Sequence, residues 1–264
     1  FFFKQKTAYE IYQCDWSSDV CSSDLWSGIS HGALIALAGL ALINPPADYK
    51  VVAAAVKAKV RRHDLDFNFR EMLATPQFYF LFLAMLSVGI GGLMVTAQVS
   101  PVAKNFKISE AALTLTLILT PLANGSSRIV WGWVSDHLGR EWTMFTAFTL
   151  QSVFLVGATT LGRTSDTLFI TLMVLVFLTW GELYVLFPAV LADLYGAKNS
   201  ALNYSFLYSA KGFASLIGSG FAATLFEKTG TWNYAFFGSA ALAMLSALMA
   251  LYVRKMPLPH KRSA

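Results

Sequence analysis

Two positively charged side chains stand inside long apolar stretches of this sequence. Arg128 is the one full charge in residues 114–134, and Lys211 lies near the middle of residues 202–226. A cation near the centre of a bilayer costs at least about 2.5 kcal/mol, so it normally faces a cavity or a partner. Arg128 has the alternative of reaching the headgroups from about one turn inside its helix end. Lys211 lacks that route, because each end of its stretch is roughly 12 Å away. Both cations are therefore candidates for a functional site that faces a cavity.

Aromatic residues and one acid accompany these cations. Trp180 and Tyr184 are four positions apart and share a helix face, whereas Glu182 points roughly the opposite way. An aromatic pair at this spacing fits either packing against lipid or the wall of a cavity. Glu182 is the one acid within an apolar stretch, and it fits either a neutral, hydrogen-bonded packing residue or a proton carrier. The residues alone leave both questions open.

A charged turn follows the stretch that contains Arg128. Gly132, Asp136, Gly139 and Arg140 form the pattern G-x-x-x-D-x-x-G-R. A glycine at position 132 permits close approach of a neighbouring helix. Asp136 is placed to cap a helix or to pair across helix ends, and Gly139 permits a left-handed turn. The pattern predicts a tight, charged connection between two membrane helices.

Six apolar segments are each long enough to cross a bilayer core, and they predict an all-α integral membrane protein: residues 78–99, 113–134, 144–161, 168–191, 202–226 and 234–253. Read as two groups of three, they place Arg128 and Lys211 on the second helix of each group. This indicates an internal repeat, with the two cations on opposing walls of one site. A ridge of small residues beside Lys211 suits close helix packing: Ala210, Ala214, Gly218 and Ala222.

The start of the chain is interpreted differently. Residues 1–25 resemble a translated sequencing adapter, have no signal-peptide features and are expected to be extended. Residues 26–44 are interpreted as the remainder of a truncated helix, and residues 45–75 as a cytoplasmic linker with an interfacial helix. Residues 76–254 hold the six spans, and residues 255–264 form a cytoplasmic tail. Both cysteines, Cys14 and Cys21, fall in the first stretch.

Composition and charge support a membrane protein. The chain is 56% hydrophobic, with a mean hydropathy of +0.54. On one side of the predicted spans only Lys104, Lys107, Arg163 and Lys228 are basic, whereas the linker, the other turns and the tail carry most of the Lys and Arg residues. This asymmetry predicts a cytoplasmic linker and C-terminus. The scattered histidines and the absence of a nucleophile–base pattern argue against an enzyme, and nothing indicates a metal, a cofactor or a nucleic-acid partner.

Several of these motifs together resemble a known family. The G-x-x-x-D-x-x-G-R turn resembles the loop motif of the major facilitator superfamily of secondary transporters, although His137 and Glu141 stand where that family often has basic residues. Three further features resemble the C-terminal half of the oxalate/formate antiporters: ANGSSR before the turn, W-x-x-x-Y at Trp180 and Tyr184, and the AKG that contains Lys211. The similarity extends from residue 26 to the end of the chain.

The resemblance implies a function. Arg128 and Lys211 would clamp a small carboxylate anion such as oxalate or formate, Trp180 and Tyr184 would line the cavity, and Tyr208 would join them. The chain would be the C-terminal six-helix half of a transporter in the bacterial inner membrane, preceded by a truncated helix and lacking its N-terminal half. Such a fragment is expected to transport nothing by itself. The alternatives are a proton-coupled monocarboxylate carrier and, in a different class, a membrane receptor or sensor.

Overall fold

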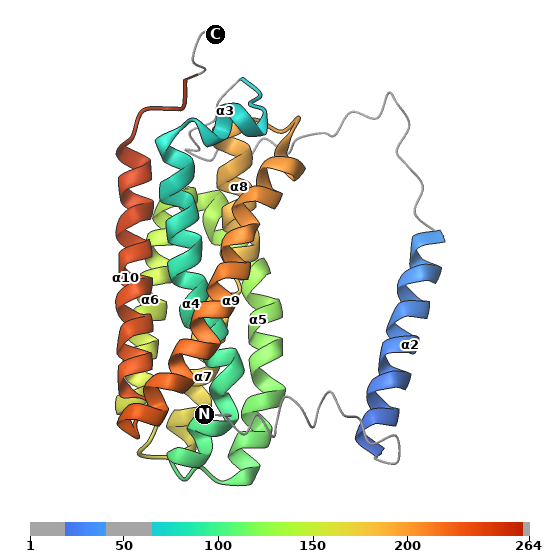
Figure 1. The fold of residues 1–264 in the computed structure, drawn as a ribbon, viewed down its shortest axis with the longest axis vertical. Helices are drawn as coiled ribbons and strands as arrows, with labels where there is room; N and C mark the ends of the chain where they lie inside the picture. Colours follow the sequence, from blue (N-terminus) through green and yellow to red (C-terminus); the bar gives the residue numbers. More distant parts are fainter. Residues whose placement is uncertain (1–18, 41–64, 261–264) are drawn as a thin grey trace. The chain divides into compact units, whose positions relative to one another are not determined.

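The computed structural model describes residues 19–40 and 65–260 (Figure 1). All regular elements of this part of the chain are α-helices: α2 (Asp19–Leu40), α3 (Phe69–Leu73), α4 (Pro76–Asn105), α5 (Glu110–Leu138), α6 (Arg140–Thr160), α7 (Asp166–Trp180), α8 (Leu183–Tyr195), α9 (Ser200–Thr229) and α10 (Asn233–Lys255). The chain divides into two units, Phe1–Ala54 and Ala55–Ala264. Helix α2 belongs to the first unit, and α3 to α10 belong to the second.

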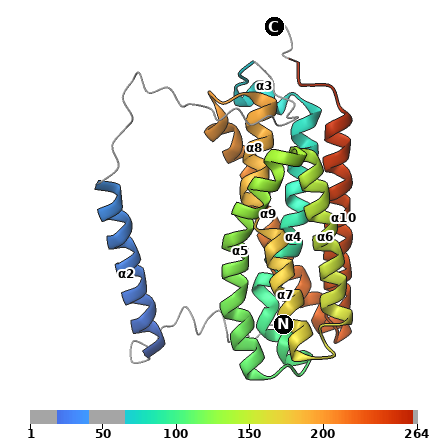
Figure 2. The same cartoon turned by 180° about the vertical axis from the view of Figure 1, so that it is seen from behind.

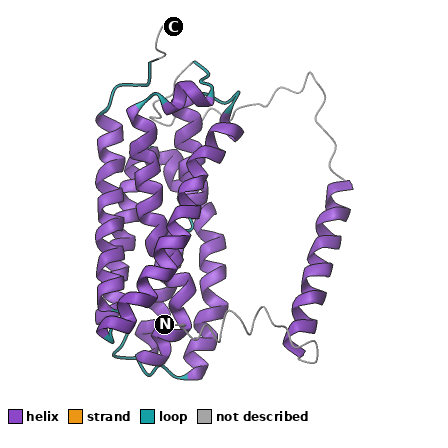
Figure 3. Cartoon of the chain, in the orientation of Figure 1, coloured by secondary structure: helices purple, strands orange, loops and turns teal. Residues whose placement is uncertain are grey.

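Helices α4 to α10 form an up-and-down bundle (Figures 1 and 2). The turn at Gly139, the start of α9 and the end of α10 lie at the same end of the bundle as α3. The turns that begin at Phe106, Leu161 and Gly230 lie at the opposite end. Short loops join the long helices throughout (Figure 3). The predicted all-α membrane fold is confirmed.

The helix contacts have the pattern expected of an internal repeat of three plus three. Helix α4 packs on α9 as α7 packs on α5, and α10 packs on α4 as α6 packs on α7. The third helices of the two groups, α6 and α10, pack extensively on each other. If each helix of the first group is replaced by its counterpart in the second group, and the reverse, the same pairs of packed helices result. A pseudo-two-fold axis between the two groups requires this. The two groups therefore interleave, and each helix makes its main contacts with the other group.

The small-residue ridge of α9 packs against α4. Ala210, Ala214, Gly218 and Ala222 are all buried. A Cβ atom added at Gly89 would lie 3.1 Å from the Cβ of Ala214, and one added at Gly218 would lie 2.7 Å from the carbonyl oxygen of Ile90. The ridge brings two helix backbones close together and fixes which face of α9 is left for Lys211.

The fourth predicted span is two helices and not one. Helix α7 ends at Trp180 and α8 begins at Leu183, so Gly181 and Glu182 form a break. Pro188 adds a second interruption, because it lacks an N–H group and cannot bond to the carbonyl of Tyr184. The break also separates the two parts of the hydrophobic core, since Trp180 belongs to one and Leu183 to the other.

Four segments of the described chain are long and apolar enough to span a membrane: Pro76–Asn105, Arg140–Thr160, Asp166–Tyr195 and Asn233–Lys255. Helices α5 and α9, which were also predicted to span, have the length but not the hydropathy. They carry Arg128 and Lys211 together with many Ser, Thr and Asn residues. A polar face on these two helices is what a central, water-accessible site requires.

The N-terminal helix differs from its prediction. Helix α2 begins at Asp19, so residues 19–25 are helical, and the expectation that they are extended was wrong. An aspartate in a first turn is stabilised by the helix dipole, and the apolar run continues to Leu40. Residues 1–18 lie outside the described residues. The adapter origin of this stretch stays a prediction.

The described end of the predicted linker packs into the bundle. Phe67 and Met72 are fully buried. The backbone N–H of Phe67 donates to the carbonyl of Tyr195 at 2.9 Å, and the side chain of Asn203 donates to the carbonyl of Phe67 at 3.1 Å. Asn68 and Glu71 close a capping box around α3. The predicted interfacial helix falls in residues 41–64, outside the described residues.

The orientation of the bundle in the membrane is a testable prediction. We expect a reporter fused after Ala264 to read cytoplasmic and one inserted at Thr164 to read external, because the loop cations concentrate on the side of the C-terminus. Alkaline phosphatase and green fluorescent protein fusions measure the two positions. The reverse pattern would contradict the predicted orientation.

Candidate anion-binding site

The two cations of the apolar spans meet at one aromatic ring. The guanidinium carbon of Arg128, on α5, lies 4.7 Å from the ring centre of Tyr184, on α8. The ammonium nitrogen of Lys211, on α9, lies 4.8 Å from the same ring centre. The distance between the guanidinium carbon of Arg128 and the ammonium nitrogen of Lys211 therefore cannot exceed the sum of these two distances. A cation over an aromatic ring gains about 0.5 to 2 kcal/mol, depending on how far it is desolvated.

Tyr208 ties Lys211 into this arrangement. The ammonium group donates a hydrogen bond of 3.0 Å to the Tyr208 hydroxyl and lies 5.3 Å from the Tyr208 ring centre. Tyr208 is one turn before Lys211, and the residue is 36% exposed. The resemblance implies that Tyr208 joins the aromatic wall of the site, and its contact with Lys211 places it next to one of the two cations.

All three helices place these side chains at the same depth. Arg128 lies ten residues before the end of α5, Tyr184 eleven before the end of α8, and Lys211 eleven after the start of α9. Those helix ends are at one end of the bundle, and ten residues of helix measure about 15 Å. Since a bilayer core is about 30 Å thick, we expect the group to lie near mid-membrane.

The two cations have no acidic partner in the described chain. The ion pairs there join Arg140 to Asp136 and to Asp193, and no carboxylate pairs with Arg128 or Lys211. Arg128 is exposed and Lys211 half-buried, so both are accessible from one side of the bundle. Two uncompensated positive charges within reach of each other form a site that an anion would stabilise.

Trp180 packs against Tyr184 and is almost fully buried, and the role in the cavity wall that the resemblance implies for it stays a prediction. Its ring meets that of Tyr184 edge-on, with centres 6.0 Å apart, and it is only 6% exposed. The indole packs against α4 where Gly92 leaves room, because a Cβ atom there would lie 1.8 Å from its ring nitrogen. Trp180 therefore supports Tyr184 from within the core.

The break between α7 and α8 positions Arg128. A Cβ atom added at Gly181 would lie 1.8 Å from the hydroxyl of Ser127 and 2.5 Å from the carbonyl oxygen of Asn124. Three residues after Arg128, the indole of Trp131 donates to the carbonyl of Leu178 at 2.8 Å. These contacts hold the turn of α5 that carries Arg128 directly against the broken helix.

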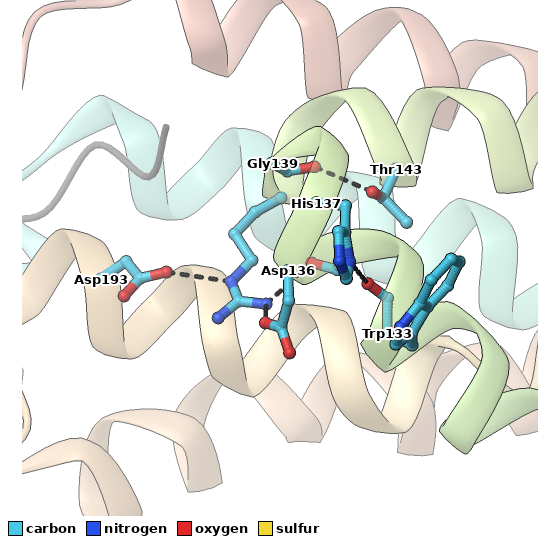
Figure 4. A network of polar contacts seen from close by, with 8 residues as sticks. Trp133, Asp136, His137, Gly139, Thr143 and Asp193 are labelled. Carbon is cyan, nitrogen blue, oxygen red and sulfur yellow. Dashed lines mark hydrogen bonds and ion pairs between the residues drawn. The ribbon is translucent and has the colours of Figure 1, made fainter. Parts of the chain in front are cut away.

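The charged turn after α5 forms an ordered network (Figure 4). Gly139 has φ +89° and ψ 157°, a backbone conformation that only glycine adopts readily. Arg140 pairs with Asp136 at 2.8 Å and with Asp193 of α8 at 3.2 Å, and it donates to the hydroxyl of Ser135 at 2.9 Å. The network joins the ends of α5 and α6 to α8.

His137 and Gly132, two other positions of the motif, do not take part in this network of ion pairs. The ring of His137 lies at a tilt against that of Trp133 and hydrogen-bonds to the backbone carbonyl of Trp133, outside the ion pairs of Arg140. At Gly132 an added Cβ would lie 3.5 Å from Val185, an ordinary contact. The close approach predicted at Gly132 is therefore mild, and the tightest contact between α5 and the broken helix is at Gly181.

Comparison with known proteins shows the family to which this chain belongs. The family model of the Major Facilitator Superfamily matches residues 77–264, which include the whole bundle from α4 onward. The chain belongs to this superfamily. It is therefore an all-α integral membrane protein of a transporter family.

Two relatives refine the position within the superfamily. The chain is 34% identical to the oxalate:formate antiporter of Oxalobacter formigenes over 229 residues, which cover 87% of this chain and 53% of that protein. It is 28% identical to the uncharacterized MFS-type transporter YhjX of Escherichia coli (strain K12) over 157 residues, covering 57% of this chain and 38% of that protein. The chain thus spans about half the length of the relatives it matches, and the resemblance to the oxalate/formate antiporters is confirmed.

Three residues that contact the site or the charged turn were not predicted from the sequence: Tyr204, Asp193 and Gly181. Tyr204 contacts Tyr208, with ring centres 5.5 Å apart, and extends the aromatic cluster by one turn. Its signal is the spacing of four from Tyr208. Asp193 stands three residues before Gly196, whose φ is +84°, just as Asp136 stands three before Gly139. The repeated D-x-x-G is a signal that the sequence carries. The packing role of Gly181 has no such signal.

Proposed function

We propose that this chain carries the C-terminal half of a substrate site that binds small carboxylates, such as oxalate and formate, for exchange across the membrane. The observation that supports it most is the convergence of Arg128 and Lys211 on the Tyr184 ring without a carboxylate partner in the described residues. At about 4 Å and an effective dielectric near 20, each cation would stabilise each negative charge by about 4 kcal/mol. Similarity to an oxalate:formate antiporter supports the same substrate class.

The charges also favour exchange over one-way transport. An empty site with two cations resists closure into a low-dielectric state, because neither charge is compensated there. A bound carboxylate neutralises it and lets the protein cross that state. Return would then require a second anion, which makes antiport the natural mode of alternating access.

We further propose that the site is completed by an N-terminal six-helix half. Arg128 and Tyr208 are exposed in the bundle, so their open side would face that half. Two such halves rocking about a central site provide alternating access. The location that follows is a bacterial inner membrane, with the C-terminus in the cytoplasm.

Counterflow in liposomes tests this function. The complete transporter, loaded with unlabelled oxalate or formate, is expected to accumulate labelled oxalate transiently, and a monocarboxylate series would measure selectivity. No counterflow with any small carboxylate would contradict the proposal. A signal that requires a proton gradient and no counter-anion would instead favour the proton-coupled carrier.

The 264-residue chain alone is expected to show no counterflow. Its cations would border lipid or water on their open side, and no second body would close over them. Reconstitution of this chain, with and without a co-expressed N-terminal half, measures the difference. Saturable exchange by the single chain that Arg128→Gln abolishes would contradict the two-half proposal.

A further inference from the structure

A narrow groove lies between α9 and α10, at the end of the bundle that holds the turn at Gly230. These two helices follow each other in the chain and lie beside α4 (Figure 1). Both pack extensively on α4 and only slightly on each other. Ile90 and Met94 of α4 therefore form the floor of the groove, and α9 and α10 form its walls. The space that these helices leave between them has a volume of about 380 Å³.

The lining of this groove is almost entirely hydrocarbon. Among the described residues that line it, only Tyr234 and Ser239 carry a side-chain oxygen, and none carries a charge. Gly238 leaves the wall formed by α10 open, because no described atom lies within 4 Å of a Cβ atom added there. Phe221 and Leu245, on the two walls, are 62% and 43% exposed. A ligand that fits this groove is therefore apolar along its length.

The groove occupies the half of the bundle next to the turn between α9 and α10. It begins at Leu225 and Tyr234 and reaches Ile217 and Leu245, each of which is twelve residues from that end of its helix. Twelve residues of helix measure about 18 Å, and half of a bilayer core is about 15 Å. We therefore expect the groove to span one leaflet. Lys211 lies six residues farther along α9, or about 9 Å, so the groove is separate from the anion site.

The width of the groove discriminates between candidate occupants. Tyr234 and Leu245 are eleven residues apart, or about 16 Å, so a volume of about 380 Å³ corresponds to a cross-section of roughly 24 Å². A helix is about 10 Å across and needs roughly 80 Å². One extended hydrocarbon chain, whose carbon atoms keep their neighbours about 4 Å away, needs roughly 20 Å². The groove has room for one acyl chain and is too narrow for another helix.

Packing supplies the free energy for holding such a chain. Bulk lipid is as apolar as the groove, so the hydrophobic effect favours neither location. On the convex surface of a single helix, an acyl chain touches protein on one side only. In the groove it touches α4, α9 and α10, and each additional pair of atoms in contact adds a small dispersion attraction. A chain in the groove is therefore retained longer than a chain in bulk lipid.

We propose that the groove between α4, α9 and α10 binds one acyl chain of a phospholipid, which belongs to the external leaflet in the predicted orientation. The headgroup then lies near Tyr234, which is 60% exposed and has the amphipathic ring that suits a membrane interface. Lys228 is exposed in the last turn of α9, at the same end of the bundle, and offers a cation for the lipid phosphate. This lipid site does not depend on the proposed carboxylate site.

Photo-cross-linking with a lipid probe tests the site. The 264-residue chain is reconstituted in phosphatidylcholine liposomes that contain a small fraction of the same lipid with a diazirine at the end of one acyl chain, and adducts are mapped by mass spectrometry. Ile90 and Leu216 lie at similar depth, because Ile90 contacts Gly218. Adducts at half-buried Ile90 are expected to exceed those at Leu216 several-fold, although Leu216 is 78% exposed. Adducts in proportion to exposure would overturn the proposal.

Matched variants separate the groove from the general lipid-facing surface. Gly238→Phe fills the groove and is expected to lower the adducts at Ile90 at least fivefold, with those at Leu216 unchanged. Gly220→Phe adds the same side chain at an exposed glycine of α9 outside the groove, where no described atom lies within 4 Å either, and should change neither. Ala241→Phe narrows the groove from α10 and should act like Gly238→Phe, so the test stays decisive should Gly238→Phe not fold. Unchanged Ile90 adducts in both groove variants would contradict the lipid site.

The remaining candidate occupants give distinct results. The cross-linking is repeated with a co-expressed N-terminal half and at a high ratio of protein to lipid. Loss of the Ile90 adducts in the presence of that half would assign the groove to the contact between halves. Their loss at high protein density would assign it to a second copy of this chain. Either result overturns the proposal, whereas adducts that persist in both preparations and are removed by Gly238→Phe support it.

Discussion

Neutralising either cation of the site is expected to reduce carboxylate exchange by about 100-fold or more. Each of Arg128 and Lys211 is assigned roughly 4 kcal/mol of interaction with the anion, and every 1.4 kcal/mol corresponds to about a factor of ten. Arg128→Gln and Lys211→Gln in the complete transporter should therefore insert into the membrane normally and fail in counterflow. Near-normal exchange in either variant would remove that residue from the site.

The same experiment distinguishes charge from position. Lys211→Arg keeps the charge but replaces a compact ammonium by a planar fork, which does not fit the short contact with Tyr208. It is expected to lose most exchange as well. Lys228→Gln at the end of α9 and Arg163→Gln in the turn before α7 remove equivalent charges far from Tyr184. Both should exchange at near wild-type rates, which would exclude a general effect of net charge.

Adding one methyl group at the helix break is expected to produce a second large loss. In Gly181→Ala the new Cβ would lie 2.5 Å from the carbonyl oxygen of Asn124, a backbone atom that moves only if α5 moves. Overpacking of this kind costs about 1 to 3 kcal/mol of stability. A shift of about 1 Å in Arg128 would lower transport by roughly 100-fold. Counterflow and thermal unfolding of the purified variant measure the two effects.

The matched control for this substitution is on α10. Gly238→Ala adds the same methyl group to a helix where nothing lies within 4 Å. Alanine is favoured over glycine by about 1 kcal/mol inside a helix, so this variant should be as stable as wild type or slightly more stable. Gly181 itself has φ −68°, a conformation that alanine adopts freely. Wild-type transport by Gly181→Ala would show that α5 does not need this close contact to place Arg128.

The charged turn shows how much of a local structure a sequence motif predicts. From the spacing of Asp136, Gly139 and Arg140, the sequence predicts a tight turn with paired charges, and the positive φ of Gly139 and the Asp136–Arg140 ion pair agree. The second partner of Arg140, Asp193, is more than fifty residues away, and although it stands in a second D-x-x-G, that repeat does not indicate that the two turns meet. Only the packing of α8 beside α5 brings it within reach.

What the sequence determined by itself is local in character. The helices, the repeat of three plus three and the charges inside them follow from hydropathy, turn residues and the cost of a buried cation, each of which acts over a few neighbouring residues. The tertiary structure decided which side chains meet: the shared ring of Tyr184, the support from Trp180, the contact of Gly181 with Ser127 and the isolation of Glu182. These depend on the rotation and the closest approach of helices distant in the chain. The presence or absence of a single Cβ atom at a glycine sets how closely two helices approach, and hydropathy does not record that difference.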